Sequence, residues 1–91
     1  MSERNHAALE RTLKAFANKR RLAIVTLLRS KKEMPVTEIA NAIHLSFKST
    51  SRHLGTLASA NIVEKDQRGL QMFYRLASDM PEKARKILML L

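Results

Sequence analysis

Apolar residues at helical spacing open the chain and predict two consecutive helices. The apolar positions of the first are Leu9, Leu13 and Phe16. They recur at i, i+4 and i+7, which places them on one face of a helix spanning about residues 5–17. Asn18 follows as an N-cap candidate, because its side-chain oxygen can accept a hydrogen bond from an unpaired amide of the next turn. The second helix, about residues 19–29, is apolar around most of its circumference, so we expect it at the centre of the core.

A short helix, a brief turn and a capped helix are predicted next, over residues 39–62. Pro35 suits the start of a third helix, where its missing N–H costs nothing. The apolar positions that follow at helical spacing are Val36, Ile39, Ala40 and Ile43. His44 stands where this helix must end, and Ser46 offers a cap for a fourth helix. This order predicts a helix-turn-helix.

The fourth helix separates apolar and polar residues onto opposite faces. Its buried face is centred on Thr50 and includes Leu54, Leu57 and Ala58. Its outward face carries Lys48, Arg52, Gly55 and Ser59, flanked by Ser49 and Thr56. Arg and Lys can donate to guanine, and hydroxyls donate or accept, so this face suits a DNA major groove.

Gly55 lies inside the fourth helix, where glycine lowers stability by about 1 kcal/mol relative to alanine. Close approach of a DNA backbone and simple tolerance of a weak spot account for this glycine equally well.

A β-hairpin is predicted after the helix-turn-helix. Asn61 can end the fourth helix in a left-handed conformation, a first strand begins at residues 62–63, and a second covers residues 70–76. Arg68 and Gly69 form the expected turn. One face of the second strand would present Leu70, Met72, Tyr74 and Leu76, and the other Gln71, Phe73 and Arg75. A hairpin in this place is a wing.

The wing carries cations of uncertain reach and is followed by one more helix. Lys65 and Arg68 can reach phosphate or the minor groove, although Glu64 and Asp66 nearly cancel their charge. Ser78 or Asp79 is the expected cap of the last helix, with Pro81 and Glu82 in its first turn. The apolar seam of that helix is Ala84, Ile87, Leu88 and Leu91. A dimer surface and intramolecular packing account for this seam equally well.

The composition adds a strong positive charge to this outline. The 91 residues suit one compact domain, mainly α with a β-hairpin wing. Seventeen Lys and Arg against eight Asp and Glu give a net charge of +9, which favours a polyanionic partner such as nucleic acid. A solvated basic surface that only aids solubility accounts for the same charge. Eight basic residues and no acidic ones lie over residues 11–32: Arg11, Lys14, Lys19, Arg20, Arg21, Arg29, Lys31 and Lys32.

Several classes of function are excluded or disfavoured by what the sequence contains. There is no cysteine, which removes disulfides, thiolate metal sites and thiol redox chemistry. We expect no cofactor and no catalytic residues, because glycine-rich phosphate loops and metal-ligand clusters are absent from the pattern. No apolar run is long enough to span a bilayer and the first residues do not resemble a signal peptide, so we expect a cytoplasmic protein.

The motifs over residues 13–76 resemble those of the ArsR-type winged helix-turn-helix repressors. The similar stretches are LKAFANKRRLAIVTLL, VTEIANAIHLSFKSTSRHLGTLASANIVEK and RGLQMFYRL, in the family's order and spacing. The resemblance implies a winged helix-turn-helix (α-α-α-α-β-β-α) that binds operators as a symmetric homodimer through its first and last helices. The implied dimer residues are Leu9, Leu13, Ala84, Ile87, Leu88 and Leu91. The implied DNA-reading positions of the fourth helix are Phe47, Lys48, Ser49, Ser51, Arg52 and His53.

The sequence departs from the family at its metal sites. Metal-sensing members carry two cysteines on the third helix, where this chain has Pro35 and Thr37, which supply no thiolate. The other family site uses Asp and His on the last helix, whereas the histidines here are His6, His44 and His53. We therefore expect no metal sensing by either route.

These observations predict a homodimeric, sequence-specific regulator of transcription that binds double-stranded DNA, most simply a repressor. Arg52 and Lys48 are the expected base or phosphate contacts, and Thr37, Ser46 and Ser49 are expected near the backbone. The full expected DNA-binding set adds Phe47, Ser51, His53, Thr56, Lys65 and Arg68. Two alternatives stay open: a low-specificity architectural or chromatin-like protein, and a protein–protein interaction module favoured by the apolar Phe47. The sequence identifies neither operator nor effector.

Overall fold

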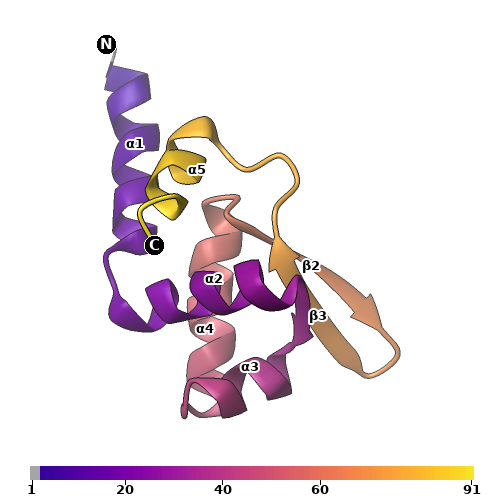
Figure 1. Ribbon diagram of the computed structural model, residues 1–91. Helices are drawn as coiled ribbons and strands as arrows, with labels where there is room; N and C mark the ends of the chain where they lie inside the picture. Colours follow the sequence, from indigo (N-terminus) through magenta and orange to yellow (C-terminus); the bar gives the residue numbers. More distant parts are fainter. Residues whose placement is uncertain (1–2) are drawn as a thin grey trace.

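The computed structural model describes residues 3–91, and their side chains from residue 5 onward. Along the chain the elements are α1 (Glu3–Phe16), α2 (Lys19–Lys31), β1 (Glu33–Pro35), α3 (Val36–Ala42), α4 (Phe47–Ser59), β2 (Val63–Arg68), β3 (Gln71–Leu76) and α5 (Glu82–Leu88). Figure 1 shows α2, α3 and α4 gathered at one end of the sheet, with the β2–β3 hairpin projecting away from them. The first and last helices, α1 and α5, lie side by side at the other end of the molecule. Within the described range, no helix is long and apolar enough to cross a bilayer.

The capped helices were predicted correctly. Asn18 accepts hydrogen bonds from the backbone amides of Arg20 (2.9 Å) and Arg21 (3.1 Å), which fixes the start of α2. The Ser46 hydroxyl accepts a bond from the amide of Ser49 (3.1 Å) and begins α4 in the same way. His44 adopts a left-handed φ of 55° in the turn between α3 and α4. The helix-turn-helix prediction is therefore confirmed.

A third strand, β1, was not predicted. It pairs antiparallel with β3, placing Met34 opposite Tyr74, and the sheet order is β1-β3-β2. The observed order is thus α-α-β-α-α-β-β-α. Pro35 ends this strand and occupies the N-cap position of α3, which begins at Val36, so its predicted place inside the helix was wrong by one residue. Three residues are too few to show a period of two in the sequence, and the strand forms because β3 offers it a partner.

The hairpin turn lies one residue later than predicted. Arg68 pairs with Gln71, which leaves Gly69, at φ 61°, and Leu70 as the two turn residues. Leu70 is fully exposed and is not part of the apolar face of β3, so that prediction was wrong. The other members of that face behave as predicted, since Tyr74 is buried and Met72 packs against the core. We call the β2–β3 hairpin with this turn, residues 63–76, the wing.

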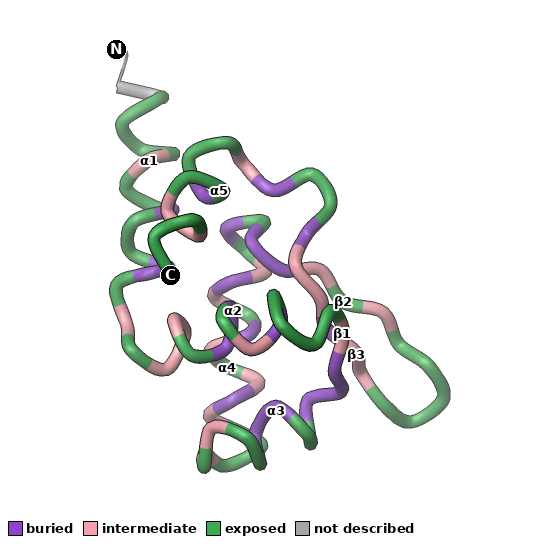
Figure 2. Tube along the Cα trace, viewed as in Figure 1, coloured by how far each residue is buried: buried purple, intermediate pink, exposed green. Residues whose placement is uncertain are grey.

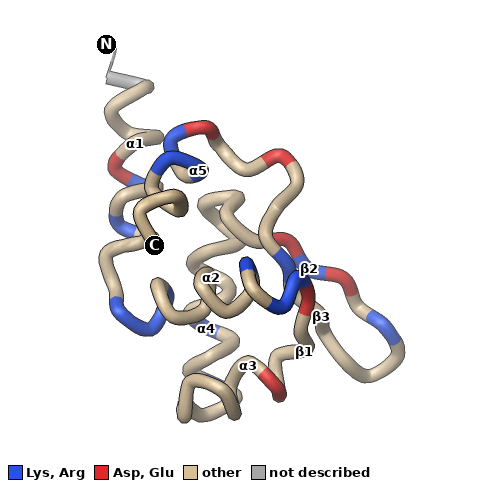
Figure 3. Tube along the Cα trace, in the orientation of Figure 1, with Lys and Arg blue, Asp and Glu red and all other residues tan. Residues whose placement is uncertain are grey.

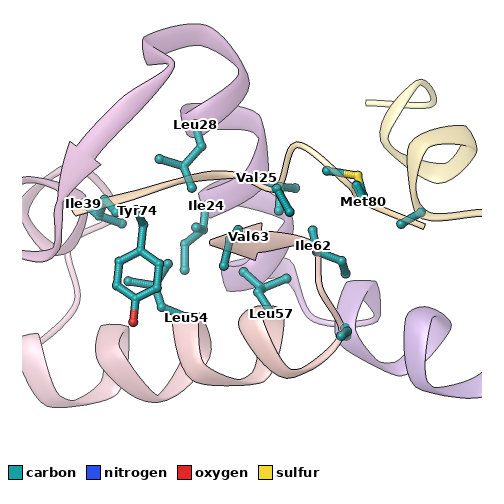
Figure 4. Packing of buried hydrophobic residues seen from close by; sticks show 14 of the residues in the cluster. Ile24, Val25, Leu28, Ile39, Leu54, Leu57, Ile62, Val63, Tyr74 and Met80 are labelled. Atoms are coloured by element: carbon teal, nitrogen blue, oxygen red, sulfur yellow. The ribbon is translucent and has the colours of Figure 1, made fainter. Parts of the chain in front are cut away.

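The core lies where α2, α4 and the sheet meet. Figure 4 shows side chains from these elements pointing toward one another, and the largest of them are fully buried. These are Ile24, Val25, Leu28, Ile39, Leu54, Leu57, Ile62 and Val63. In Figure 2 the buried stretches converge on this region while the wing tip is exposed throughout. The predicted central position of α2 is confirmed by Ile24, Val25 and Leu28.

The last helix begins differently from the prediction. Pro81 is its N-cap residue, and no side chain caps the helix, so neither Ser78 nor Asp79 has the expected role. The segment before α5 is held by other bonds: the side-chain amide of Asn61 donates to the carbonyl oxygen of Asp79 at 3.1 Å. Asn61 has the left-handed φ (58°) that the sequence predicts. This bond therefore joins the segment before α5 to the C-terminal end of α4.

Candidate nucleic-acid interface

The exposed face of α4 is the centre of the candidate interface. Thr50, Leu54 and Leu57 are fully buried on one side of the helix and fix its rotation about its axis. The residues predicted to face outward, Lys48, Arg52, Gly55 and Ser59, are all exposed. Ser49, Ser51 and Thr56 are half-buried along the edges of this face. The fold thus presents two long cations and small hydroxyls together on one helix surface.

Two flanking hydroxyls already have bonds within the helix. The Thr56 hydroxyl donates to the carbonyl oxygen of Arg52 at 3.3 Å, and the Ser59 hydroxyl donates to that of Thr56 at 2.8 Å. Both hydroxyl oxygens still have acceptor capacity. A β-carbon at Gly55 would meet no protein atom within 4 Å. The fold itself therefore does not require glycine there.

Phe47 is the exception on this helix. Its side chain is 58% exposed at the first position of α4, beside Lys48. Phe47 also lines a small hollow of about 110 Å³ together with Thr37 of α3 and Leu70 of the wing. The ring is therefore partly packed and partly available to a partner.

His53 links α4 to the start of α2. Its Nδ1 lies 3.1 Å from Nη1 of Arg21, which donates as a guanidinium, so the ring nitrogen accepts. The guanidinium of Arg21 also donates to the carbonyl oxygens of Ala15 (2.7 Å) and Lys14 (3.1 Å). Burial lowers the pKa of His53, and the positive charges of Arg21, Arg20 and Arg52 lower it further. His53 thus joins α4 to the α1–α2 junction through its contact with Arg21.

The turn of the helix-turn-helix is held by a second arginine of α2. Nη1 of Arg20 donates to the carbonyl oxygen of Ile43 at 3.2 Å, where α3 ends. The backbone amide of Leu45 then bonds to the carbonyl oxygen of Ala40 at 3.0 Å. Thr37 is exposed in the first turn of α3. The sequence pattern did not predict that Arg20 holds this turn. Its carbonyl partner is twenty-three residues away and leaves no local signal.

The wing places its two predicted cations in different situations. Lys65 is exposed on β2. Arg68 instead donates to both carboxylate oxygens of Glu33 at 2.8 Å and to Asp66 at 2.9 Å. Its guanidinium also lies 4.6 Å from the centre of the Phe73 ring. In this structure the donors of Arg68 are directed to carboxylates of the protein, so a phosphate contact from Arg68 would require these bonds to be exchanged.

A row of charged side chains crosses the three strands beside Arg68. Arg75 of β3 lies opposite Glu33 of β1 and Glu64 of β2 in the sheet register. It contacts Glu33 at 3.3 Å and Glu64 at 2.8 Å. The bond from Arg68 lowers the pKa of Glu33, and the backbone amide of Ser78 lowers that of Glu64. The contact between Glu33 and Arg75 was not predicted, because Glu33 lies on β1 and the sequence pattern did not predict that strand.

Charge is therefore unevenly placed over the molecule. Figure 3 shows Lys and Arg without acidic neighbours around the start of α2, whereas positive and negative residues alternate on the sheet. Lys48 and Arg52 are exposed on α4. The positive surface available to a polyanion thus comes from the helices, and the sheet contributes a largely neutral face.

The predicted dimer residues lie on α1, on α5 and, for Leu91, just after α5, but they are not equally available. Leu13 is 50% exposed, Leu91 is exposed, and Leu9 is half-buried. Ile87 and Leu88 pack partly against the core, and Ala84 is fully buried within the chain. Ala84 therefore has no surface left for a partner, because its methyl group already completes the intramolecular core. Arg29 of α2 holds the end of the chain by donating to the carbonyl oxygens of Leu88 and Leu91, both at 2.9 Å.

Among the described residues, no three His, Asp or Glu side chains gather in a way that suits a metal ion. The two positions at which the family resemblance implies metal ligands hold Pro35, at the N-cap of α3, and Thr37, in its first turn; both lack a metal-binding group suited to soft ions.

A winged helix-turn-helix whose second helix, here α4, exposes a cationic face is characteristic of DNA-binding transcription regulators. Residues 18–65 match the bacterial regulatory proteins of the arsR family, and the chain belongs to this family. The function of the family is regulation of transcription, so the chain is a regulator and not an enzyme.

Relatives in this family differ in their regulatory effect. The transcriptional activator HlyU of Vibrio cholerae is 36% identical over 76 residues, which cover 84% of this chain and 69% of HlyU. The arsenical resistance operon repressor of Escherichia coli is 33% identical over 75 residues, covering 82% of this chain and 64% of the repressor. This chain thus spans only about two thirds of the length of these relatives.

Solved structures confirm the fold. The structure of HlyU from Vibrio cholerae has a TM-score of 0.82 at 31% identity, covering 98% of this chain and 92% of that one. The homodimeric winged helix-turn-helix DNA-binding domain of a possible ArsR-family regulator from Mycobacterium bovis has a TM-score of 0.80 at 33% identity. That match covers 99% of this chain and 82% of the other.

Proposed function

We propose that residues 1–91 act as one DNA-binding domain that dimerises through α1 and α5 and binds a specific operator. The two α4 helices of the dimer enter successive major grooves about 34 Å apart. The observation that carries this proposal is the exposed face of α4, where Lys48 and Arg52 stand beside small hydroxyls on a helix held rigidly by its buried side. A rigid reading face is what base discrimination needs.

The proposed contact set follows from exposure and position. It comprises Thr37, Ser46, Phe47, Lys48, Ser49, Ser51, Arg52, His53, Thr56 and Lys65, without Arg68. The proposed dimer set comprises Leu9, Leu13, Ile87, Leu88 and Leu91, without Ala84. The homodimeric Mycobacterium bovis domain supports this arrangement.

The proposed effect on transcription is repression that does not depend on a metal. A dimer seated on an operator blocks other proteins from the same DNA, and this needs no further domain. Pro35, the N-cap residue of α3, and Thr37 of its first turn support metal independence, because they offer no thiolate. Adding arsenite or Zn²⁺ should leave the affinity for the operator unchanged, and a metal-dependent release of DNA would contradict this part. A chromosomal DNA partner also implies action in the cytoplasm.

Selection of bound duplexes from a random pool tests the central proposal. We expect a palindromic consensus whose half-sites are one helical turn apart, with affinity that falls steeply as salt rises. Equal binding to all duplexes would instead favour an architectural or chromatin-like protein, and no duplex binding at all would reject the proposal.

Phe47 supports one second candidate, an interaction module that binds another protein. An apolar ring that is 58% exposed on the reading face is unusual beside cations. If this candidate is right, Phe47→Ala should leave duplex affinity unchanged. A loss of affinity or a changed consensus at one thymine would assign Phe47 to DNA, because an apolar side chain can contact the thymine methyl group.

A further inference from the structure

Leu70 stands at the outermost point of the wing. It is one of the two turn residues between β2 and β3 and is fully exposed, and it follows Gly69 at φ 61°. Figure 1 shows this turn at the far end of the projecting hairpin. A single exposed leucine is ordinary on a protein surface. Its surroundings make this one informative.

Arg68, the cation nearest to Leu70 in the sequence, is bound to acidic side chains of the protein. Arg68 is the only Lys or Arg over residues 66–74. Its guanidinium is bound to both oxygens of Glu33 and to Asp66 and lies over the Phe73 ring. In the sheet register Arg68, Asp66 and Phe73 share one face, whereas Met72 and Tyr74 share the other. The wing therefore presents an alkyl group at its end and holds Arg68 on the face away from the core, whereas the exposed Lys65 lies farther from the turn, on the face of Tyr74.

Leu70 also lies beside the start of α4, the helix that we propose reads DNA. It lines the same small hollow as Phe47 of α4 and Thr37 of α3, with Met72 and Gln67 of the wing. A duplex whose major groove receives α4 therefore has its neighbouring backbone and groove next to the wing tip. The neighbouring groove is the minor groove, about 6 Å wide, which admits a single aliphatic side chain more readily than a helix.

We propose that Leu70 enters the minor groove beside the α4 half-site as an apolar wedge. The partner is the same operator duplex, so this inference rests on the proposed function. An aliphatic side chain placed against a base step partly unstacks it, and flexible pyrimidine–purine steps yield at least cost. Leu70 thereby selects for a deformable step at the edge of the half-site, without itself donating a hydrogen bond or adding a phosphate contact.

The experiment uses the full chain and a duplex of about 30 base pairs recovered by selection. The duplex is prepared with a TA step or a GG step at the flanking position, and with 2-aminopurine placed in the TA step. We expect tighter binding to the TA duplex and a rise in 2-aminopurine fluorescence on binding. Leu70→Ala should weaken TA binding about tenfold, abolish the preference and remove the fluorescence change, because most of the alkyl group is lost.

Two further variants test whether the effect belongs to the Leu70 side chain and not to its neighbours. Gln71→Ala, which truncates the neighbouring exposed side chain, is the matched control and should bind as the wild type does. Arg68→Gln should leave the slope of log affinity against log salt unchanged, because its guanidinium is occupied by carboxylates. Thermal unfolding of each variant checks that the wing is retained.

Three results would overturn the wedge or the proposal beneath it. If Leu70→Ala binds like the wild type and the fluorescence does not change, the wedge is rejected while the reading by α4 stands. A salt slope lowered by about one in Arg68→Gln would also overturn it, since the wing would then use its cation. Failure of the wild type to bind any duplex would reject both this inference and the proposed function.

Discussion

Residues of α4 are either buried in the core or exposed on the face that we propose for recognition. The buried Thr50 and the exposed Lys48 are two residues apart, so they lie on opposite sides of the helix. The sequence predicted both sides correctly, because helical periodicity depends only on local spacing. It mispredicted Leu70, whose position depends on the turn register, and it did not reveal the partner of Arg68 on the unpredicted strand β1.

Replacement of Thr50 by valine should stabilise the protein. The Thr50 hydroxyl is fully buried, and among the described residues its oxygen is the one buried side-chain polar atom without a hydrogen-bond partner. Valine has nearly the same shape and removes the unpaired group, so we expect the free energy of unfolding to rise by about 1 kcal/mol. Equilibrium urea denaturation measures this change. A loss of stability would mean that the hydroxyl has a partner, such as a buried water.

Replacement of Lys48 by glutamine should reduce the salt dependence of DNA binding. Lys48 is exposed on the reading face, where an ammonium group releases counterions when it meets a phosphate. The slope of log affinity against log salt should fall by about one, and the loss of affinity should be similar for all sequences. Fluorescence anisotropy over a series of salt concentrations gives the slope. Lys83, exposed on α5, is the matched lysine whose replacement should leave the slope as it is.

At the scale of elements, local caps were predictable and long-range pairing was not. Asn18 and Ser46 form the expected caps because each bonds to amides two or three residues away. Strand β1 has only three residues, and its partner β3 is far downstream, so its existence depends on the assembled fold. The row of charged side chains across the sheet, Glu33, Arg75 and Glu64, could not be predicted for the same reason.

Acid should weaken the packing of β1 against the sheet. The pKa values of Glu33 and Glu64 are below their ordinary values in the folded protein, chiefly through bonds from Arg68 and from the Ser78 amide. Unfolded chains therefore bind more protons than folded ones below about pH 4.5. The stability contributed by these carboxylates is fully present above that pH and is lost as pH falls toward the lowered pKa values.

Thermal unfolding at a series of pH values measures this effect. We expect Glu33→Gln to unfold at a lower temperature than the wild type at neutral pH and to show a smaller further decrease on acidification. The exposed Glu38 of α3, for which no bond or ion pair appears in the structure, provides the control Glu38→Gln. An acid response in Glu33→Gln as large as in the wild type would show that other carboxylates cause it.

At the scale of the whole molecule, we propose different tasks for the two ends of the fold. The helix-turn-helix and wing form one end, and the apolar surface of α1 and α5 forms the other. Met89, Leu90 and Leu91 are exposed after α5, so this end presents apolar side chains that the described core does not cover. The sequence pattern left intramolecular packing and dimerisation equally open. The structure assigns Ala84 to the first and leaves Leu13 available for the second.

Replacement of Leu13 by glutamate should therefore separate the proposed dimer without unfolding the chain. Leu13 is 50% exposed, so a single chain tolerates a charge there, whereas a partner surface pressed against it does not. Sedimentation equilibrium should give twice the 10.4 kDa chain mass for the wild type and the single mass for the variant. Leu70→Glu, at the exposed wing tip, should keep the mass of the wild type. A wild-type monomer would contradict the dimer.

The central claim is that the exposed face of α4 reads bases, and Arg52 tests it most directly. Duplexes are selected from a random pool with the wild type and with Arg52→Ala under the same salt concentration. We predict that the variant loses the preference for guanine at one symmetric pair of positions and binds the wild-type consensus about 1 to 3 kcal/mol more weakly. An unchanged consensus with unchanged affinity would contradict the claim that this face reads the operator.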